Sequence, residues 1–433
     1  MPLHHTVEEI VLKNGMRGLL IDVPGSSVVS YEIHFLAGNY FSPSTKVQQT
    51  AHLMEHMAFG GTEEFPTQER FSQEFTKNGA YHNATTWQYE MSYYADCALM
   101  EWSRILDLQQ LAITAPLFTE EILQAEKGNV REELTGQENN RRRILWQKTL
   151  RAMGDKMFID AEKVKTINDV VLSDIENHYK KTHTLQNMRF SFAGDLSKHK
   201  DYIVSELEGW KLETGSRLDV PEQTLHSAPP VAIYRQDMPS VIFTIMIALN
   251  RKYTEEEKLA LNALNHILTG THHSRILGKA RTRGLCYGMG SMVDVDADAI
   301  SRFEVGGQVS ADNAPALFEL IAEELSKAAE GDITDVELDS AKQYGLGTHQ
   351  MNGQTVGGVN SWYASQYFED GTIDLMERAP EQIEAVKLGD MQKLIKELLT
   401  TGEWTIGVIG AIRKPEVNKL YSIIEKRMHQ GVK

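Results

Sequence analysis

Strand-like and helix-like stretches recur twice along the chain, in the same order. The segments "YEIHFLAGN" at 31–39 and "FTIMIALNR" at 243–251 each predict a strand, and a helical pattern follows each of them. The segments "NMRFSFAGD" and "EWTIGVIGA", which end at Asp195 and Ala411, each predict a strand and a turn. The hydrophobic pattern therefore predicts the same elements in both halves of the chain.

Helical segments repeat at nearly the same interval. The segment "FTEEILQAEKG" predicts a helix from Thr119, and "ITDVELDSAKQ" predicts one from Thr334, 215 residues later. Helices around Asp174 and Asp390, 216 residues apart, come before the last strand of each half. Blocks that keep their order at nearly constant offsets indicate an internal duplication.

The duplication predicts an α+β fold with two homologous domains, each a mainly antiparallel sheet with helices packed on one face. We place the first domain at residues 1–208 and the second copy at residues 229–433. Residues 209–228 are rich in Gly, Ser, Thr and Pro, which is typical of a linker.

With 41% hydrophobic and 24% charged residues, the 433-residue chain has the composition of an ordinary globular protein. Its net charge of −16 argues against nucleic acid and anionic membranes as partners, since both would repel it. No apolar run reaches the roughly 18 residues of a membrane span, and no signal or transit peptide is seen. Because only Cys97 and Cys286 occur, we expect a reducing, cytoplasmic location.

Chemistry enters with the stretch "AHLMEHMAFGG" at 51–61. Residues 45–58 predict a helix, with the hydroxyls of "SPST" as caps before it and "FGG" as its end. On a helix, His52, Glu55 and His56 share one face. Two imidazoles one turn apart can bind one zinc ion, and the glutamate beside them can reach the attacking water. The alternative is a surface helix that carries two histidines by chance.

Zinc needs a third protein ligand, and the acidic helix "TEEILQAEKGNVREELTG" offers the best supply. Glu126 and Glu133 are seven residues apart and so share a face of that helix. One of them can bind the metal while the other supports a ligand from behind. Spacing alone does not choose among Glu126, Glu132 and Glu133.

The motif "HLMEHMAFGGT", with "AEKGNVREEL" following it, resembles the inverted zinc motif of the insulinase/pitrilysin metallopeptidases. The two-copy layout is similar to the subfamily that contains the mitochondrial processing peptidase and its bacterial relatives. The resemblance implies one Zn²⁺ per chain, with His52, His56 and Glu133 as its ligands. It also implies Glu55 as the catalytic base and Glu126 as the supporting acid.

Further roles are implied by the same resemblance. Asn83, Ala84 and Thr85, in "GAYHNATTWQYEMSYYAD", would lie on an edge strand that pairs with the substrate backbone. Tyr287 would reach the substrate from the second copy, together with an arginine of "SRILGKARTRGLCYGMG". Arg281 takes the place of that arginine when the segment is counted from its start, and Arg283 is the other candidate.

The second copy differs from the first at the motif. If His56 corresponds to His266, then Asn262 and Asn265 stand where the first copy has His52 and Glu55. By the 215-residue offset, Ala341 stands for Glu126 and Thr348 for Glu133. The second copy keeps the scaffold and has lost the ligands. This difference favours a metal site in the first copy only.

The sequence therefore predicts a zinc-dependent endopeptidase that cleaves short or unfolded peptides. The family encloses its site in a chamber of four such domains, so the resemblance implies a dimer. A homodimer is expected, and a heterodimer is the other arrangement. Two rival functions are a non-catalytic partner or scaffold subunit of a processing-peptidase-like complex, and a different zinc hydrolase that acts on small amides.

Overall fold

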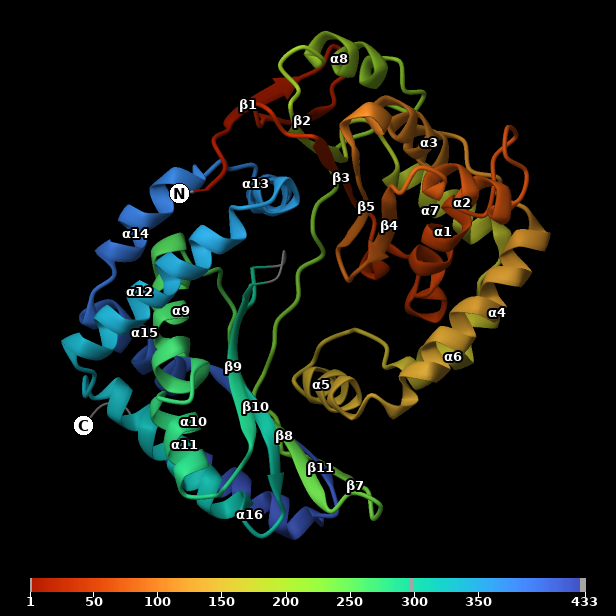
Figure 1. Cartoon of the computed structure of the whole chain (residues 1–433). Coiled ribbons are helices and arrows are strands. Elements are labelled where there is room, and N and C mark those ends of the chain that lie inside the picture. Colours follow the sequence, from red (N-terminus) through yellow and green to blue (C-terminus); the bar gives the residue numbers. More distant parts are fainter. Residues whose placement is uncertain (1, 296–298, 429–433) are drawn as a thin grey trace. The chain divides into compact units, whose positions relative to one another are not determined.

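A six-stranded sheet organises the first part of the computed structural model, which describes residues 2–295 and 299–428. Its strands are β1 (Thr6–Val11), β2 (Arg17–Asp22), β3 (Val28–Leu36), β4 (Tyr81–Thr86), β5 (Glu90–Ala98) and β6 (Met188–Gly194). They lie in the order β1-β2-β6-β3-β5-β4, which places β4 at an edge (Figure 1). The β2–β6 pair is parallel, and every other neighbouring pair is antiparallel.

A five-stranded sheet organises the second part. Its strands are β7 (Val231–Tyr234), β8 (Ser240–Leu249), β9 (Gly288–Val295), β10 (Ser301–Ser310) and β11 (Glu403–Gly410). They lie in the order β7-β11-β8-β10-β9, with β7–β11 parallel and the rest antiparallel. Apart from β1, the two sheets therefore correspond strand for strand, including the position of the parallel pair. This match confirms the predicted duplication and the α+β class.

Helices bury the core face of each sheet. Those with the first sheet are α1 (Thr50–Ala58), α2 (Gln68–Thr76), α3 (Trp102–Thr114), α4 (Glu120–Gly136), α6 (Asp160–Thr166), α7 (Leu172–Thr182) and α8 (Lys200–Glu208). Those with the second are α9 (Glu255–Asn265), α10 (Arg275–Thr282), α11 (Ala314–Ala329), α12 (Asp335–Asn352), α14 (Ala379–Ala385), α15 (Leu388–Thr401) and α16 (Lys414–Glu425). No helix among the described residues combines the length and apolar character needed to cross a membrane.

Two helices are exchanged between the halves of the sequence. Helix α13 (Val356–Asp370) follows the second sheet's helices in the chain, yet it packs on β3 and β6 of the first sheet. It covers the face opposite the main core, where Leu19 and Ile21 contact Val359 and Tyr363. Conversely, α5 (Arg141–Ala152) packs on β11 and β8 of the second sheet. Gly407 permits this approach, because a Cβ there would lie 2.2 Å from the hydroxyl of Thr149 on α5.

The exchange makes both compact units discontinuous in sequence. The first unit comprises residues 1–136, 160–221 and 349–378, and the second comprises 137–159, 222–348 and 379–433. The predicted contiguous domains, 1–208 and 229–433, differ from these units by the exchanged segments. The main boundary, after Pro221, falls within the predicted linker 209–228. Which sheet α5 and α13 cover depends on tertiary packing, which a local sequence pattern does not encode.

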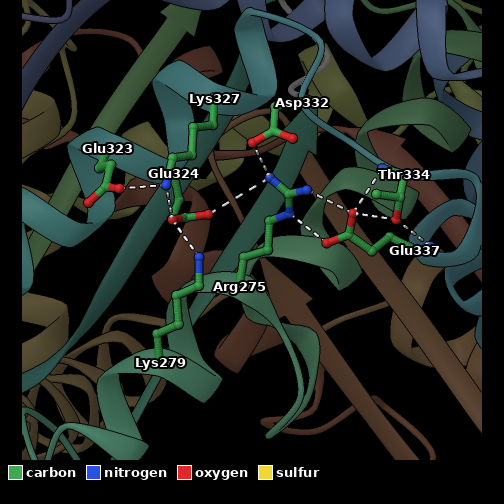
Figure 2. A network of polar contacts seen from close by, with 8 residues as sticks. All are labelled: Arg275, Lys279, Glu323, Glu324, Lys327, Asp332, Thr334 and Glu337. Carbon is green, nitrogen blue, oxygen red and sulfur yellow. Dashed lines mark hydrogen bonds and ion pairs between the residues drawn. The ribbon is translucent and has the colours of Figure 1, made fainter.

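An ion-pair network joins α10, α11 and the start of α12 in the second unit (Figure 2). Arg275 forms two hydrogen bonds with the Glu337 carboxylate, of 2.6 and 2.8 Å. Glu324 is only 1% exposed. Its Oε1 forms ion pairs with Nζ of Lys279 at 2.7 Å and with Nζ of Lys327 at 3.3 Å. These contacts tie three helices of the second unit together at a place where its packing is polar.

Candidate functional site

Helix α1 presents two different faces. Its core face is fully buried and comprises Leu53, Met54 and Met57. The other face carries His52, Glu55 and His56, all only partly buried. The rings of His52 and His56 lie with their centroids 4.9 Å apart, as the spacing of one turn requires. The core face thus fixes the orientation in which the polar face is displayed.

The start of this helix differs from the prediction. Residues Thr45–Val47 form a separate 3-10 turn, and α1 begins only at Thr50. The predicted capping by "SPST" is wrong, because Gln49 occupies the N-cap position. The hydroxyl of Thr50 bonds back to the Val47 carbonyl at 2.6 Å and so stabilises the turn that interrupts the helix.

Helix α4 brings its acidic face to α1. Oε2 of Glu133 lies 3.5 Å from Nε2 of His52 and 3.6 Å from Nε2 of His56. Oε2 of Glu126 lies behind His56 instead, 2.9 Å from its Nδ1. The Glu126 side chain is almost fully buried, whereas that of Glu133 is half exposed. Glu133 therefore faces both imidazoles and Glu126 lies behind one of them. The spacing of the two residues in the sequence could not distinguish these positions.

The donor set fits a zinc ion. His52, His56 and Glu133 each offer a ligand atom, and these atoms lie within 4.8 Å of one another. Two imidazole nitrogens and one carboxylate are a set that zinc takes at catalytic sites, with a fourth position for water. Nδ1 of His56 donates a hydrogen bond to Glu126, so Nε2, which faces Glu133, is the nitrogen that would bind the metal once its proton is displaced. Glu132 is not a member of this cluster.

Protonation of the metal-free cluster reflects its crowding. Burial lowers the pKa of His56, but hydrogen bonds to Glu126 and Glu133 outweigh burial and raise that pKa to about 10. Hydrogen bonds from His52 and His56 hold the pKa of the Glu133 carboxyl far below its usual range. Burial raises the pKa of Glu126, yet bonds from His56 and Asn129 leave it lowered. The carboxylates therefore stabilise the protonated form of His56, and the bonds from the histidines stabilise the ionised carboxylates.

Glu55 lies beside the cluster with one oxygen already engaged. The hydroxyl of Thr86, the last residue of β4, donates to Oε2 of Glu55 at 2.7 Å. The second carboxylate oxygen keeps its capacity to accept a proton. Thr86 was not identified from the sequence, although it directly follows the predicted substrate residues Asn83–Thr85 in β4. Its hydroxyl, next to the predicted substrate strand, was the signal that could have pointed to it.

The predicted substrate strand lies at the edge of the first sheet. Asn83, Ala84 and Thr85 all belong to β4, whose outer side has no neighbouring strand within the described residues. A pocket of 490 Å³ opens beside this strand, with Glu55 and His56 among its lining residues. An unpaired edge next to a pocket is the geometry that strand addition of a peptide needs. Pairing with a substrate stays a prediction.

Tyr287 and Arg281 belong to the second unit. The Tyr287 side chain is exposed, and the Arg281 guanidinium lies over its ring, 4.8 Å from the centroid. Arg281 also donates a hydrogen bond to the Tyr287 carbonyl. Arg283 caps the end of α10 instead. The pairing of Arg281 with Tyr287 is established, and a role of either side chain at the metal centre stays a prediction.

Comparison with known proteins places the chain in a family. Residues 21–157 match the family described as Insulinase (Peptidase family M16), and residues 169–344 match the one described as Peptidase M16 inactive domain. The chain belongs to peptidase family M16. The resemblance drawn from the histidine motif is thereby confirmed. The "inactive domain" match ends within the part of the chain that lacks the ligand set.

One of the curated relatives matches over nearly its whole length. An uncharacterized zinc protease of Streptomyces coelicolor is 22% identical over 97% of this chain and 93% of its own length. The insulin-degrading enzyme of Drosophila melanogaster is 25% identical over 64% of this chain but only 29% of that enzyme. The mitochondrial-processing peptidase subunit beta of Mus musculus is 27% identical over 44% of this chain and 43% of that subunit. The chain thus spans less than half of the latter two relatives.

The M16 fold is also found among solved structures. A peptidase M16 inactive domain from Pseudomonas fluorescens superimposes with a TM-score of 0.83 over 94% of this chain and 99% of that one. Its sequence identity is 17%, so the likeness concerns the fold. The two-unit architecture is therefore shared across nearly the whole length of both chains.

Proposed function

We propose that this M16 family member is a zinc-dependent endopeptidase that cleaves short or unfolded peptides. The observation that carries the proposal is the cluster of His52, His56 and Glu133, whose ligand atoms lie within 4.8 Å of one another. The zinc protease relative supports a metal at the level of the family. The description "inactive domain" applies to a different stretch of the chain from the one that carries the cluster.

The chain's own residues account for the steps of hydrolysis. Zinc held by the cluster would polarise the scissile carbonyl and acidify the attacking water. Glu55, held through one oxygen by Thr86, would accept the water's proton on its other oxygen. It would then pass that proton to the nitrogen of the leaving amine. The peptide would bind as an added strand beside Asn83–Thr85, so that backbone hydrogen bonds supply much of the affinity.

The test is digestion of unfolded peptides by the zinc-loaded protein, read by mass spectrometry. We expect fragments cut at internal bonds, and none from zinc-loaded Glu55→Gln, because an amide cannot accept the water's proton. A base of this kind is typically worth about 10²–10⁴-fold in rate. Zinc-loaded protein that cuts no peptide would instead support a scaffold subunit. Cleavage confined to small amides would support a different hydrolase.

A dimer that encloses the site is part of the proposal. In this arrangement, Tyr287 of one chain serves the zinc of its partner and donates to the developing oxyanion. Glu55→Gln and Tyr287→Phe should each be weak alone. Hybrid dimers of the two variants should recover part of the activity, because one of their two sites is whole. Verified hybrids without recovery would show that Tyr287 does not act across a dimer.

A further inference from the structure

The second ring nitrogen of His52 meets a residue that the motif does not include. Nδ1 of His52 lies 3.2 Å from the amide oxygen Oε1 of Gln49, three residues earlier in the chain. Gln49 is 1% exposed, so this contact is sheltered from water. The opposite nitrogen, Nε2, faces Oε2 of Glu133 at 3.5 Å. His52 is therefore held between an amide on one side and the candidate metal position on the other.

The position of Gln49 makes this contact unusual. It is the N-cap of α1, where a short polar side chain normally accepts a hydrogen bond from the first turn of the helix. The Gln49 side chain makes no such capping bond. Its amide oxygen bonds to His52 instead, because residues three apart lie on one side of a helix. The side chain thus does not stabilise the helix end in the usual way.

The consequence is a defined tautomer. An amide oxygen only accepts, so Nδ1 of His52 must carry the hydrogen. The lone pair of the ring then lies on Nε2 and points toward Glu133. Glu126 does the same for His56 with a carboxylate. Each of the two histidines therefore has a hydrogen-bond acceptor at Nδ1, the neutral Gln49 amide for His52 and the charged Glu126 carboxylate for His56.

We propose that Gln49 is a positioning residue of the metal centre, which presents Nε2 of His52 to the ion. This inference rests on the proposed function, because it requires that His52 binds zinc. Residues behind a metal-bound histidine typically contribute about 10–100-fold to metal affinity. Since the Gln49 amide is neutral, its loss should fall near the lower end of that range.

The experiment measures the zinc dissociation constant by competition with a chelator, and so does not depend on activity. Gln49→Leu removes the acceptor and should weaken zinc binding about tenfold. Gln49→Glu restores an acceptor oxygen and should bind zinc at least as tightly as the wild type. If Gln49→Leu binds zinc like the wild type, or if Gln49→Glu is as weak as Gln49→Leu, the inference is wrong.

The chain supplies a matched control. Gln109 on α3 is fully buried in the same unit, and neither of its amide atoms has a hydrogen-bond partner among the described residues. Gln109→Leu therefore makes the same chemical change away from the cluster and should leave zinc affinity unchanged. Thermal unfolding of the metal-free variants checks that each one folds. Failure of the wild type to bind zinc would overturn the proposed function itself, a result distinct from equal binding by wild type and Gln49→Leu.

Discussion

The two sheets of this protein have the same topology, yet the helices beside them carry different chemistry. In the first unit, His56 on α1 is bonded to Glu126 on α4. In the second unit, His266 directly after α9 stacks on Tyr344 of α12, with ring centroids 4.2 Å apart. Among the residues that the structure describes, Nδ1 of His266 is buried without a hydrogen-bond partner, whereas Nδ1 of His56 has one. An aromatic stack thus takes the place of an acidic cluster.

This difference shows that the fold does not need the ligands. Both helices bury an apolar face, which comprises Leu53, Met54 and Met57 in α1 and Ala260, Leu261 and Leu264 in α9. Such burial stabilises either helix at about 25 cal/mol per Å², whatever the other face carries. His52, Glu55 and His56 are only partly buried, and the second unit folds without this set of three. Their presence together in the first unit is therefore best explained by function.

A hydroxyl persists where the base is lost. Thr86 on β4 donates to Glu55, and Ser291 on β9 donates to Asn265. Both hydroxyls come from the edge strand of their sheet. Thr86 pairs with Met91 and Ser291 with Val305, so the two donors stand at different positions along their strands. What the two units share is a hydroxyl from the edge strand bonded to the helix, and the carboxylate is what distinguishes the first unit.

The largest expected effect is on metal content. Purified protein should hold about one zinc ion per chain, because within the described part of the chain only the first unit has the ligand set. His52→Asn, which copies Asn262 of the second unit, should abolish most of that binding, and Asn262→Ala should leave it unchanged. Elemental analysis checks this. Two ions per chain, or full retention in His56→Ala, would contradict the comparison.

The next largest effect should distinguish the roles of the two carboxylates of α4 in zinc binding. Glu133→Gln replaces a charged ligand with a neutral one and should lose most of the zinc. Glu126→Gln removes only the acceptor behind His56, so that its affinity should fall about 10–100-fold. Chelator competition on both variants measures the two effects. If Glu126→Gln loses the metal and Glu133→Gln retains it, the two roles are exchanged.

The edge-strand hydroxyl should matter for activity in the first unit only. Thr86→Val removes the donor to Glu55 and should lower kcat about tenfold, with zinc content unchanged. Thr86→Ser should recover most of the rate, because it keeps the hydroxyl. Ser291→Ala, which removes the donor to Asn265 in the second unit, should have no effect on kcat. Steady-state kinetics on a cleaved peptide compares the three, and equal rates for Thr86→Val and wild type would exclude this positioning.

The smallest effect concerns the sheet face under α13. There His34 is bonded to Glu32 and Glu90, while the corresponding strand β8 carries buried Met246. Burial lowers the pKa of His34, but the two carboxylates outweigh burial and raise that pKa to about 10. A raised pKa adds stability below the unfolded value of about 6.5, and this stability is lost as the pH rises through about 10.

The free energy of unfolding should therefore fall across that pH range in the wild type. His34→Met should show a flatter dependence, since it cannot gain or lose the proton. Urea unfolding at neutral pH and at about pH 10 measures the difference. Parallel curves for the two proteins would show that His34 does not hold the extra proton in the folded state.

The sequence by itself determined the duplication, the helix with His52, Glu55 and His56 on one face, and the loss of that set in the second copy. These features depend on local periodicity and spacing, which fix which side chains share a face. Spacing left open which of Glu126 and Glu133 is the ligand, and only the family resemblance implied Glu133; tertiary structure places Glu133 against both imidazoles and Glu126 behind His56. It also decided which sheets α5 and α13 cover. Contacts between segments far apart in the chain depend on how helices and strands pack, and no local pattern encodes that packing.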